Sequence, residues 1–356
     1  MRRALPPAAC HDGSVNKRSE PRSRMILRRV RSIPLVLIAF VVVTVLLIPL
    51  LAVAIVVDLL RLAITRCPPT ITRLALILWC WLFAETVGMT ALLVIWVVSA
   101  FGRNVGRLQR QTFAVQQSWA AWMLGAARIL FRLNIEVEGS AAAQPGPYLL
   151  FVRHVSILDN LLPAAVISRP FWINLRYVLK RELLADPCFD IAGQRLPNYF
   201  VERDSGDPAG LQRVRDLTVG LGDHDGVLIY PEGTRVTAER RARALERIAK
   251  RDPLRAERLA VLEHCLPPRT GGPLALFGAA PELDIVLLMH AGLDGLKGIG
   301  DVLGGALVRR RIVVRVERYE RASIPAGPAT ADWLDQRWIE IDRWVGSTLA
   351  EIKAEG

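Results

Sequence analysis

The sequence predicts an α/β fold, a mostly parallel sheet covered by helices, preceded by an N-terminal membrane hairpin of two helices. Two observations support this prediction. Residues 33–57 and 74–98 are long apolar stretches separated by a short segment that contains prolines. After residue 140, continuous apolar runs of strand length alternate with helical stretches or loops, which is typical of parallel strands buried on both faces.

The first 32 residues form a basic segment ahead of the apolar stretches. Residues 1–31 carry nine lysines and arginines against two acidic residues, a net charge of +7 out of +12 for the whole chain. A basic segment beside a membrane helix attracts anionic lipid headgroups and is retained on the cytoplasmic side. No basic–aromatic motif of nucleic-acid-binding proteins is present. We therefore expect a partly disordered cytoplasmic tail at residues 1–32 and membrane lipids, not nucleic acid, as partners.

Each apolar stretch is long enough to cross a bilayer, which needs about 20 helical residues. Residues 33–57 contain no charged residue, and Pro68 and Pro69 mark a turn before residues 74–98. A secretory signal would have a shorter apolar core and a cleavage site. We interpret residues 33–101 as a two-helix hairpin in a bacterial-type inner or plasma membrane, with the rest of the chain on the cytoplasmic side.

Three residues within these stretches leave alternatives open. Pro34 and Pro49 can break or kink a helix, so the pair could instead enter one leaflet and return. Glu85 is the only charged residue of its stretch. An acid in a membrane segment marks either a functional site or a polar contact with the partner helix.

The remaining residues, 102–356, are predicted to form the α/β domain. An amphipathic helix is expected at 113–133, a charged pair of surface helices at 239–262, and a further amphipathic helix at 331–352. Strands are expected at five apolar runs: 148–152, 175–179, 226–230, 284–289 and 311–316.

The cysteines argue against a disulfide framework or a zinc site. They are odd in number, scattered, and contain no C-x-x-C pair, which suits a reducing compartment and predicts no metal ion. The five are Cys10, Cys67, Cys80, Cys188 and Cys265.

A histidine and an aspartate follow the first predicted strand of the domain. Ligands bind at the carboxyl ends of strands in parallel sheets, and His154 stands directly after such an end. His154 and Asp159 can meet if the histidine precedes a helix that begins near Ser156 and the aspartate lies in its first turn. Histidine, with a pKa of about 6.5, can act as a general base that a carboxylate orients. The alternative is structural, because Ser156 and Asp159 also match a helix capping box.

Three downstream segments complete a family pattern. Residues 178–204 contain "VLKRELLADP" and "FVER", residues 227–235 read "VLIYPEGTR", and residues 264–290 end in an apolar run. With His154 and Asp159, these segments resemble the blocks H-x-x-x-x-D, F-x-x-R and E-G-T-R and the late strand of the glycerolipid acyltransferase family, which includes the lysophosphatidic acid acyltransferases. The resemblance covers residues 148–292 and identifies 102–356 as an acyltransferase domain.

The resemblance also implies roles for individual residues. His154 and Asp159 match the catalytic pair of the family. The late block falls at residues 285–289, and the segment "PPRTGG" is expected to line the same cleft. Expected around the acceptor phosphate are Arg203, Glu232, Gly233, Thr234 and Arg235, with Lys180 and Arg269 as further lining residues. The sequence departs from the family pattern at Arg153, where Asn is usual, at Pro197, where Gly is usual, and in the lack of a proline at 285–289.

The activity that the resemblance implies is transfer of a fatty acyl chain from acyl-CoA or acyl carrier protein to a lysophospholipid, above all 1-acyl-glycerol-3-phosphate. No G-x-S-x-G motif is present. We therefore expect direct attack by the acceptor hydroxyl, without an acyl-enzyme, a metal ion or a cofactor. Two alternatives remain: another acceptor, such as a lyso-aminolipid or a glycolipid, and an inactive, membrane-tethered lipid-binding protein.

Overall fold

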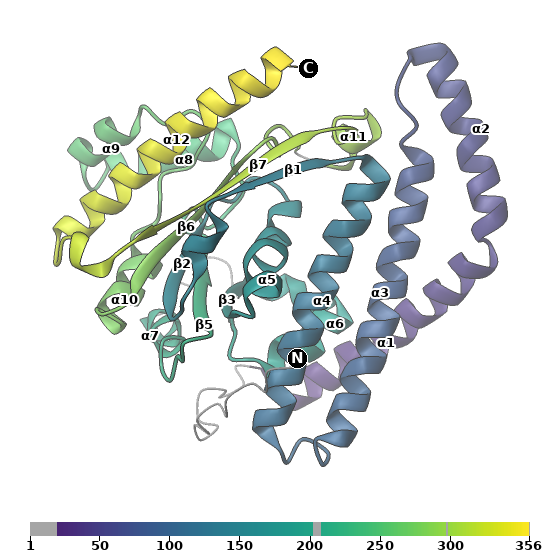
Figure 1. Ribbon diagram of the computed structural model, residues 1–356, viewed down its shortest axis with the longest axis horizontal. Helices are drawn as coiled ribbons and strands as arrows, with labels where there is room; N and C mark the ends of the chain where they lie inside the picture. Colours follow the sequence, from purple (N-terminus) through teal and green to yellow (C-terminus); the bar gives the residue numbers. More distant parts are fainter. Residues whose placement is uncertain (1–19, 202–207, 297, 356) are drawn as a thin grey trace.

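The computed structural model describes residues 20–201, 208–296 and 298–355. A seven-stranded sheet in the order β1-β7-β6-β2-β5-β3-β4 forms its centre, with helices on both faces (Figure 1). Every neighbouring pair is parallel except β6 and β7, which are antiparallel. The predicted class, a mostly parallel sheet covered by helices, is confirmed. The strands are β1 (Asn134–Glu138), β2 (Tyr148–Val152), β3 (Asn174–Lys180), β4 (Tyr199–Val201), β5 (Asp225–Ile229), β6 (Asp284–Ala291) and β7 (Arg311–Tyr319).

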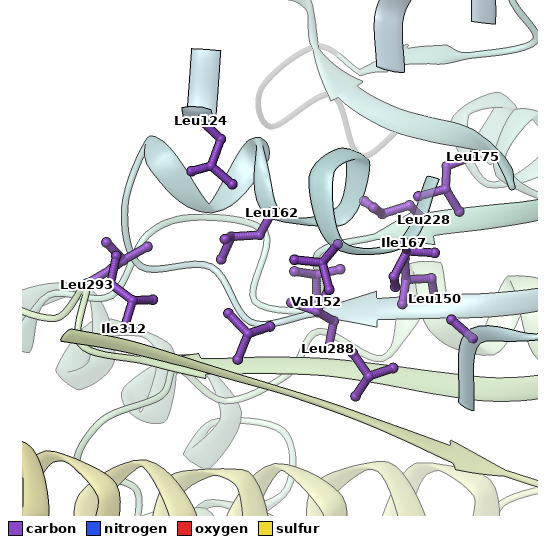
Figure 2. Close-up of a cluster of buried hydrophobic side chains, with 14 of the residues drawn as sticks. Leu124, Leu150, Val152, Leu162, Ile167, Leu175, Leu228, Leu288, Leu293 and Ile312 are labelled. Atoms are coloured by element: carbon purple, nitrogen blue, oxygen red, sulfur yellow. The ribbon is translucent and has the colours of Figure 1, made fainter. Parts of the chain in front are cut away.

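Strand β2 shows why the sheet is buried on both faces. Its side chains alternate between two hydrophobic clusters, as the two-residue period of a strand requires. Tyr148, Leu150 and Val152 pack on the side of helix α4 (Val105–Phe131), part of which Figure 2 shows. Leu149 and Phe151 pack on the other side, against helix α12 (Ala329–Glu355) and its neighbours. All five side chains are essentially inaccessible to water. Burial on both faces of the strand explains why its sequence is an unbroken apolar run.

The other helices of the domain are short. The predicted pair at 239–262 is present as α8 and α9, and the predicted C-terminal helix lies within α12. Helix α4 begins eight residues earlier than predicted, where Asn104 caps it by accepting a hydrogen bond from the Arg107 N–H. The α-helices are α5 (Arg169–Phe171), α6 (Pro187–Arg195), α7 (Pro208–Asp216), α8 (Ala238–Ala249), α9 (Pro253–Leu259), α10 (Gly271–Ala279) and α11 (Ile299–Leu303). Single-turn and π-helical segments are η1 (Ser140–Ala143), η2 (Leu158–Asn160), η3 (Ala164–Ser168), η4 (Arg181–Ala185) and η5 (Arg321–Ser323).

The prediction of one continuous helix across residues 33–57 is wrong. Helix α1 (Arg22–Val45) ends where α2 (Leu47–Thr65) begins, with Leu46 between them. Pro49 explains the break, because it has no N–H to donate to the Val45 carbonyl and its ring clashes with that carbonyl in a regular helix. Helices α2 and α3 (Ile71–Val98) lie side by side and are long and apolar enough to cross a membrane. A third of the α3 span is buried within the protein, so the same features also suit a core helix.

The turn between α2 and α3 is held by one carboxylate. Asp58 accepts hydrogen bonds from the backbone N–H groups of Thr70, Ile71 and Thr72, which are otherwise unpaired at the start of α3. Arg61 donates to the carbonyl of Leu303 at the end of α11. The tip of the helix pair is thereby tied to the α/β domain.

Glu85 of α3 makes a contact with the domain. The side chain is fully buried, and one oxygen accepts a hydrogen bond from the N–H of Cys188 at 3.2 Å. Cys188 belongs to α6, so this contact joins Glu85 to the α/β domain and not to α2. Gly88 lies one turn further along, where a β-carbon would come within 2.7 Å of the Cys188 sulfur. Glu85 and Gly88 together permit the close approach of α3 and α6.

The cysteines that the structure describes are free thiols. Cys10 lies outside the described residues, as does most of the predicted basic tail. From Arg22 onward the chain is helical, so the part of the tail that can be described is ordered.

Candidate active site

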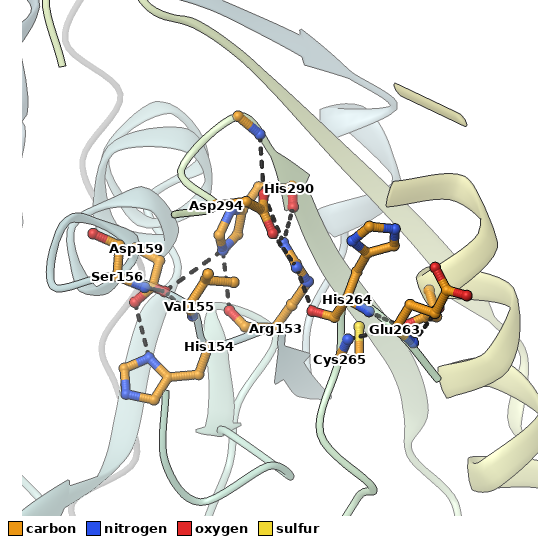
Figure 3. A network of polar contacts seen from close by, with 12 residues as sticks. Arg153, His154, Val155, Ser156, Asp159, Glu263, His264, Cys265, His290 and Asp294 are labelled. Atoms are coloured by element: carbon orange, nitrogen blue, oxygen red, sulfur yellow. Dashed lines mark hydrogen bonds and ion pairs between the residues drawn. The ribbon is translucent and has the colours of Figure 1, made fainter. Parts of the chain in front are cut away.

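The predicted pair meets directly after β2. His154 Nδ1 lies 3.0 Å from Asp159 Oδ1, and Asp159 is fully buried (Figure 3). The second carboxylate oxygen, Oδ2, accepts hydrogen bonds from the N–H groups of Val155 and Ser156 at 2.6 and 2.7 Å. Asp159 therefore caps the turn with Oδ2 and contacts the histidine with Oδ1, so the capping role and the contact with His154 do not exclude each other. The helix expected to begin near Ser156 is only the single turn η2.

The electrostatics of the pair favour an ionised Asp159 carboxylate. Burial of Asp159 opposes ionisation, but hydrogen bonds from His154 and His290 outweigh it and hold the pKa of the carboxyl well below its usual range. An ionised Asp159 requires a proton on His154 Nδ1, and the lone pair is then on Nε2. His154 lines a cavity, so a basic nitrogen is available to a molecule bound there.

This cavity has a volume of about 580 Å³ and lies at the carboxyl ends of β2, β3 and β5. Four of the residues implied by the resemblance line it together with His154: Lys180, Gly233, Arg235 and Arg269. Arg203 lies outside the described residues. The apolar part of the wall includes Ile157, Leu179, Leu183, Leu211, Ile229 and Pro273. A cavity with cationic groups and an extended apolar wall suits an amphiphilic molecule that carries negative charge.

Glu232 and Thr234, also assigned to the acceptor site, do not line the cavity. Glu232 is buried, and its two oxygens accept hydrogen bonds from the N–H groups of His154 and Leu266 at 3.0 and 3.1 Å. Burial raises the pKa of Glu232 to about 8, although the charge of Arg153 and the two backbone donors lower it. The structure thus gives Glu232 a positioning role, because it ties the His154 turn to the β5 turn and the segment after α9.

Gly233 is required by its backbone conformation and by its neighbour. Its φ of +68° lies in the left-handed region, and a β-carbon there would come within 2.8 Å of Arg269 Nε. Glycine therefore lets the Arg269 guanidinium lie against the turn that carries Arg235. Tyr230 packs its ring on that of His154, with 4.6 Å between ring centroids. These contacts fix the cavity wall on both sides of the histidine.

Arg153, which replaces the usual Asn of the family, is a buried cation behind the site. It donates to the carbonyls of His290 and His264 at 2.7 and 2.6 Å and pairs with Asp294 at 2.5 Å (Figure 3). Its own carbonyl lies 3.1 Å from His290 Nε2, and that nitrogen is 3.7 Å from Asp159 Oδ2. Arg153 therefore joins the His154 turn to the end of β6.

His290 and Asp294 were not predicted. A polar residue at the end of the apolar run 284–289 was the available signal, because the carboxyl ends of neighbouring parallel strands lie at one edge of the sheet. Across residues 20–201, 208–296 and 298–355, no group of histidine, cysteine and acidic side chains has a metal-binding arrangement.

Comparison with known proteins shows what this chain is similar to. A family model described as "Acyltransferase" matches residues 134–271, which include the His154 turn and the turn at 232–235. The chain is 22% identical over 249 residues to lysocardiolipin acyltransferase 1 of Danio rerio, covering 65% of this chain and 60% of that protein. It is 29% identical over 122 residues to 1-acyl-sn-glycerol-3-phosphate acyltransferase of Pseudomonas aeruginosa, covering 34% of this chain and 46% of that protein. The matches thus span about half to three-fifths of these relatives.

A solved structure has the same fold. The crystal structure of the 1-acyl-sn-glycerophosphate acyltransferase PlsC from Thermotoga maritima superposes with a TM-score of 0.51 at 13% identity, covering 80% of this chain and 99% of that one. The matched family model and the two curated relatives support a glycerolipid acyltransferase family for this chain, and the His154–Asp159 pair lies where the pattern of that family predicts it.

Proposed function

We propose that the protein is a membrane-associated O-acyltransferase that moves a fatty acyl chain from acyl-CoA or acyl carrier protein to a lysophospholipid hydroxyl. The preferred acceptor is 1-acyl-glycerol-3-phosphate, which gives phosphatidic acid. The observation that supports this best is the 3.0 Å contact between His154 Nδ1 and the buried Asp159, because His154 lines a cavity that Arg235 and Arg269 also line. It combines a general base with groups that bind a phosphate.

The proposed reaction is a direct displacement. His154 Nε2 accepts the proton of the acceptor hydroxyl while the oxygen attacks the thioester carbonyl, and the carbon–sulfur bond then breaks. The imidazolium returns the proton to the leaving thiolate, so the histidine ends the cycle neutral. Asp159 remains ionised throughout, stabilises the imidazolium and holds the ring in one orientation.

Acceptor recognition is assigned to the cationic side of the cavity. A guanidinium group donates two parallel, charge-assisted hydrogen bonds to a phosphate, which suits Arg235 and Arg269. Lys180 lines the same cavity and adds a third cationic side chain. The apolar wall then accommodates the start of an acyl chain. Arg203 is kept in this site as part of the proposal, on the family pattern alone.

The membrane supplies the lipid acceptor and retains the product. Helices α2 and α3 are long and apolar enough to insert into it, and much of α2 is exposed. We place the catalytic domain on the cytoplasmic side of a bacterial-type inner or plasma membrane, where acyl thioesters are available.

The test is an assay of the purified full-length chain with labelled acyl-CoA or acyl carrier protein and a panel of lysolipids, with products identified by mass spectrometry. We expect phosphatidic acid from 1-acyl-glycerol-3-phosphate and no product from His154→Ala. Preference for a lyso-aminolipid or glycolipid would retain the chemistry but change the acceptor. A folded wild-type chain that binds lysolipids without acylating any of them would support an inactive lipid-binding protein.

Arg235→Ala should impair use of the phosphate acceptor. Loss of a hydrogen bond to a charged group costs about 1.5–3 kcal/mol, which corresponds to a rise in acceptor KM of about ten- to 150-fold. Turnover at saturation should change little, because the phosphate lies away from the reacting carbonyl. Steady-state kinetics over a range of acceptor concentrations measure both parameters.

The matched control is Arg241→Ala, which removes an arginine that contacts the Glu263 carbonyl outside the cavity. It should leave the acceptor KM unchanged. A monoacylglycerol, which has no phosphate, should be used equally well by wild type and Arg235→Ala. An unchanged KM for the phosphate acceptor in Arg235→Ala would remove this residue from the acceptor site.

A further inference from the structure

A second cavity lies where the N-terminal helices meet the domain. Its volume is about 290 Å³, just below the range of about 300–1,000 Å³ that is usual for small-molecule pockets. It is bounded by the first turns of α1, the last turn of α3, the start of α4 and the end of α6, and it shares no lining residue with the His154 cavity. Its polar and large side chains are Met25, Arg29, Trp96, Leu108, Gln194 and Arg195.

Two arginines from different helices face this space, and one of them has no acidic partner among the residues that can be described. Arg195 donates to the backbone carbonyl of Leu92 at 2.8 Å. Burial, together with repulsion from Arg29, lowers the pKa of Arg195 to about 10. Two cations held this close in a partly buried cavity destabilise each other until an anion lies between them.

The nearest acids do not neutralise this charge completely. Asp190 is fully buried and accepts from Arg29 Nε at 2.8 Å, but it also accepts from Arg28 at 2.7 Å. Arg28 in turn contacts Glu20. Arg28 and Arg29 therefore share the Asp190 carboxylate, whereas Arg195 of α6 forms no ion pair with the acidic residues that the structure describes.

The position of the cavity indicates a lipid as the source of the anion. Trp96 forms part of its wall in the last turn of α3, a helix that is long and apolar enough to cross a membrane. The rings of Trp96 and Phe101 pack edge to face, with 5.0 Å between their centroids. Phe101 is 63% exposed, and Val97 and Val98 are exposed as well. Tryptophan at the end of such a helix is typical of the headgroup layer. Figure 1 shows this end of α3 at the turn into α4.

We propose that this cavity binds the phosphate headgroup of an anionic membrane phospholipid. Arg195 and Arg29 donate hydrogen bonds to the phosphate oxygens, and the glycerol and acyl chains leave the cavity along Trp96 toward the exposed apolar surface of α3. Basic pockets between membrane helices bind anionic headgroups in this way. The bound lipid bridges α1, α3 and α6, so it fixes the N-terminal helices on the domain. This inference does not depend on the acyl transfer proposed above.

The experiment uses the full-length chain in an uncharged detergent, with dihexanoyl phosphatidylglycerol as the probe. Affinity is measured from the rise in melting temperature and from the lipid-bound fraction in native mass spectrometry. We expect saturable binding by the wild type and at least a tenfold loss of affinity in Arg195→Gln. Dihexanoyl phosphatidylcholine should not compete, because its choline group neutralises the phosphate.

Two controls make the result specific. Arg31→Gln removes the same charge from an exposed position on α1 that does not line the cavity, and it should bind as the wild type does. Arg235→Ala, at the other cavity, should also bind normally, so that a failure here is distinct from a failure of the proposed reaction. Arg195→Lys keeps the charge without the planar fork and should show an intermediate affinity.

Three outcomes would overturn the proposal. The first is equal affinity of Arg195→Gln and the wild type. The second is an equal loss in Arg31→Gln, which would show nonspecific attraction to basic surface residues. The third is that inorganic phosphate binds with the same affinity and the same dependence on Arg195, since the site would then take free phosphate and the apolar surface would contribute nothing.

Discussion

Asp159→Asn should leave the protein folded and reduce turnover at least about a hundredfold. An asparagine can keep its oxygen on the N–H groups of Val155 and Ser156, and asparagine caps about as well as aspartate. Its amide nitrogen then faces His154 Nδ1 and donates to it, so the proton moves to Nε2 and the base is lost. In serine proteases the corresponding change costs about 10⁴-fold for the same reason, and a general base contributes about 10²–10⁴-fold.

Turnover at saturating substrate and the melting temperature should be measured on the same preparations. His154→Ala is the reference for complete loss of the base, and it should lie at or below the activity of Asp159→Asn. Near-normal turnover in a folded Asp159→Asn enzyme would leave Asp159 with a capping role alone. Normal turnover in a folded His154→Ala enzyme would exclude the histidine as the base.

Arg153→Leu should destabilise the fold by about 3–5 kcal/mol, the range for removal of one partner of a buried ion pair. The side chain of Arg153 is completely buried, and its loss would leave Asp294 without its cationic partner and the carbonyls of His264 and His290 without the guanidinium donor. The double variant with Asp294→Leu should recover part of the loss, because no uncompensated carboxylate remains. Chemical denaturation in detergent, followed by tryptophan fluorescence, measures the difference.

The contrast is an exposed pair. Lys250 and Glu246 lie 2.9 Å apart on α8 with side chains that are 71% and 66% exposed. Lys250→Ala should cost at most about 0.5 kcal/mol, as is usual for such pairs on a helix. A similarly small effect of Arg153→Leu would mean that the buried network contributes little to stability.

The strands predicted correctly are those whose residues form a continuous apolar run in the sequence. The run at 148–152 coincides with β2 because both faces of that strand are buried, so every residue is apolar. Strands β1 and β4 were missed because they lie at the two edges of the sheet, where partial exposure permits a mixed sequence. The antiparallel direction of β7 leaves no trace in its own residues, since the two-residue period is the same for both directions.

The candidate site also has parts that the sequence predicts and parts that only the folded chain shows. His154 and Asp159 are five residues apart, so a local turn brings them together and the sequence could predict it. Glu232 carries a family motif, but its partner is a backbone N–H 78 residues away, and only the folded chain shows that it supports the turn. The helix break at Leu46 has a local cause, Pro49, so the sequence alone contains the signal for it.

The residues that hold the His154 turn are far from it in the sequence, and this separation determines when the site can form during synthesis. The His154 turn is held by Glu232, 78 residues later, and by the Arg153 contacts to His290 and Asp294, 137 and 141 residues later. Contacts between distant segments form late in folding, and a chain emerging from the ribosome makes its earlier segments first. A nascent or truncated chain that ends before Asp294 therefore carries the histidine without the scaffold that orients it. We therefore expect incomplete copies of the protein to lack acyl-transfer activity, because the residues that orient His154 are synthesised after it.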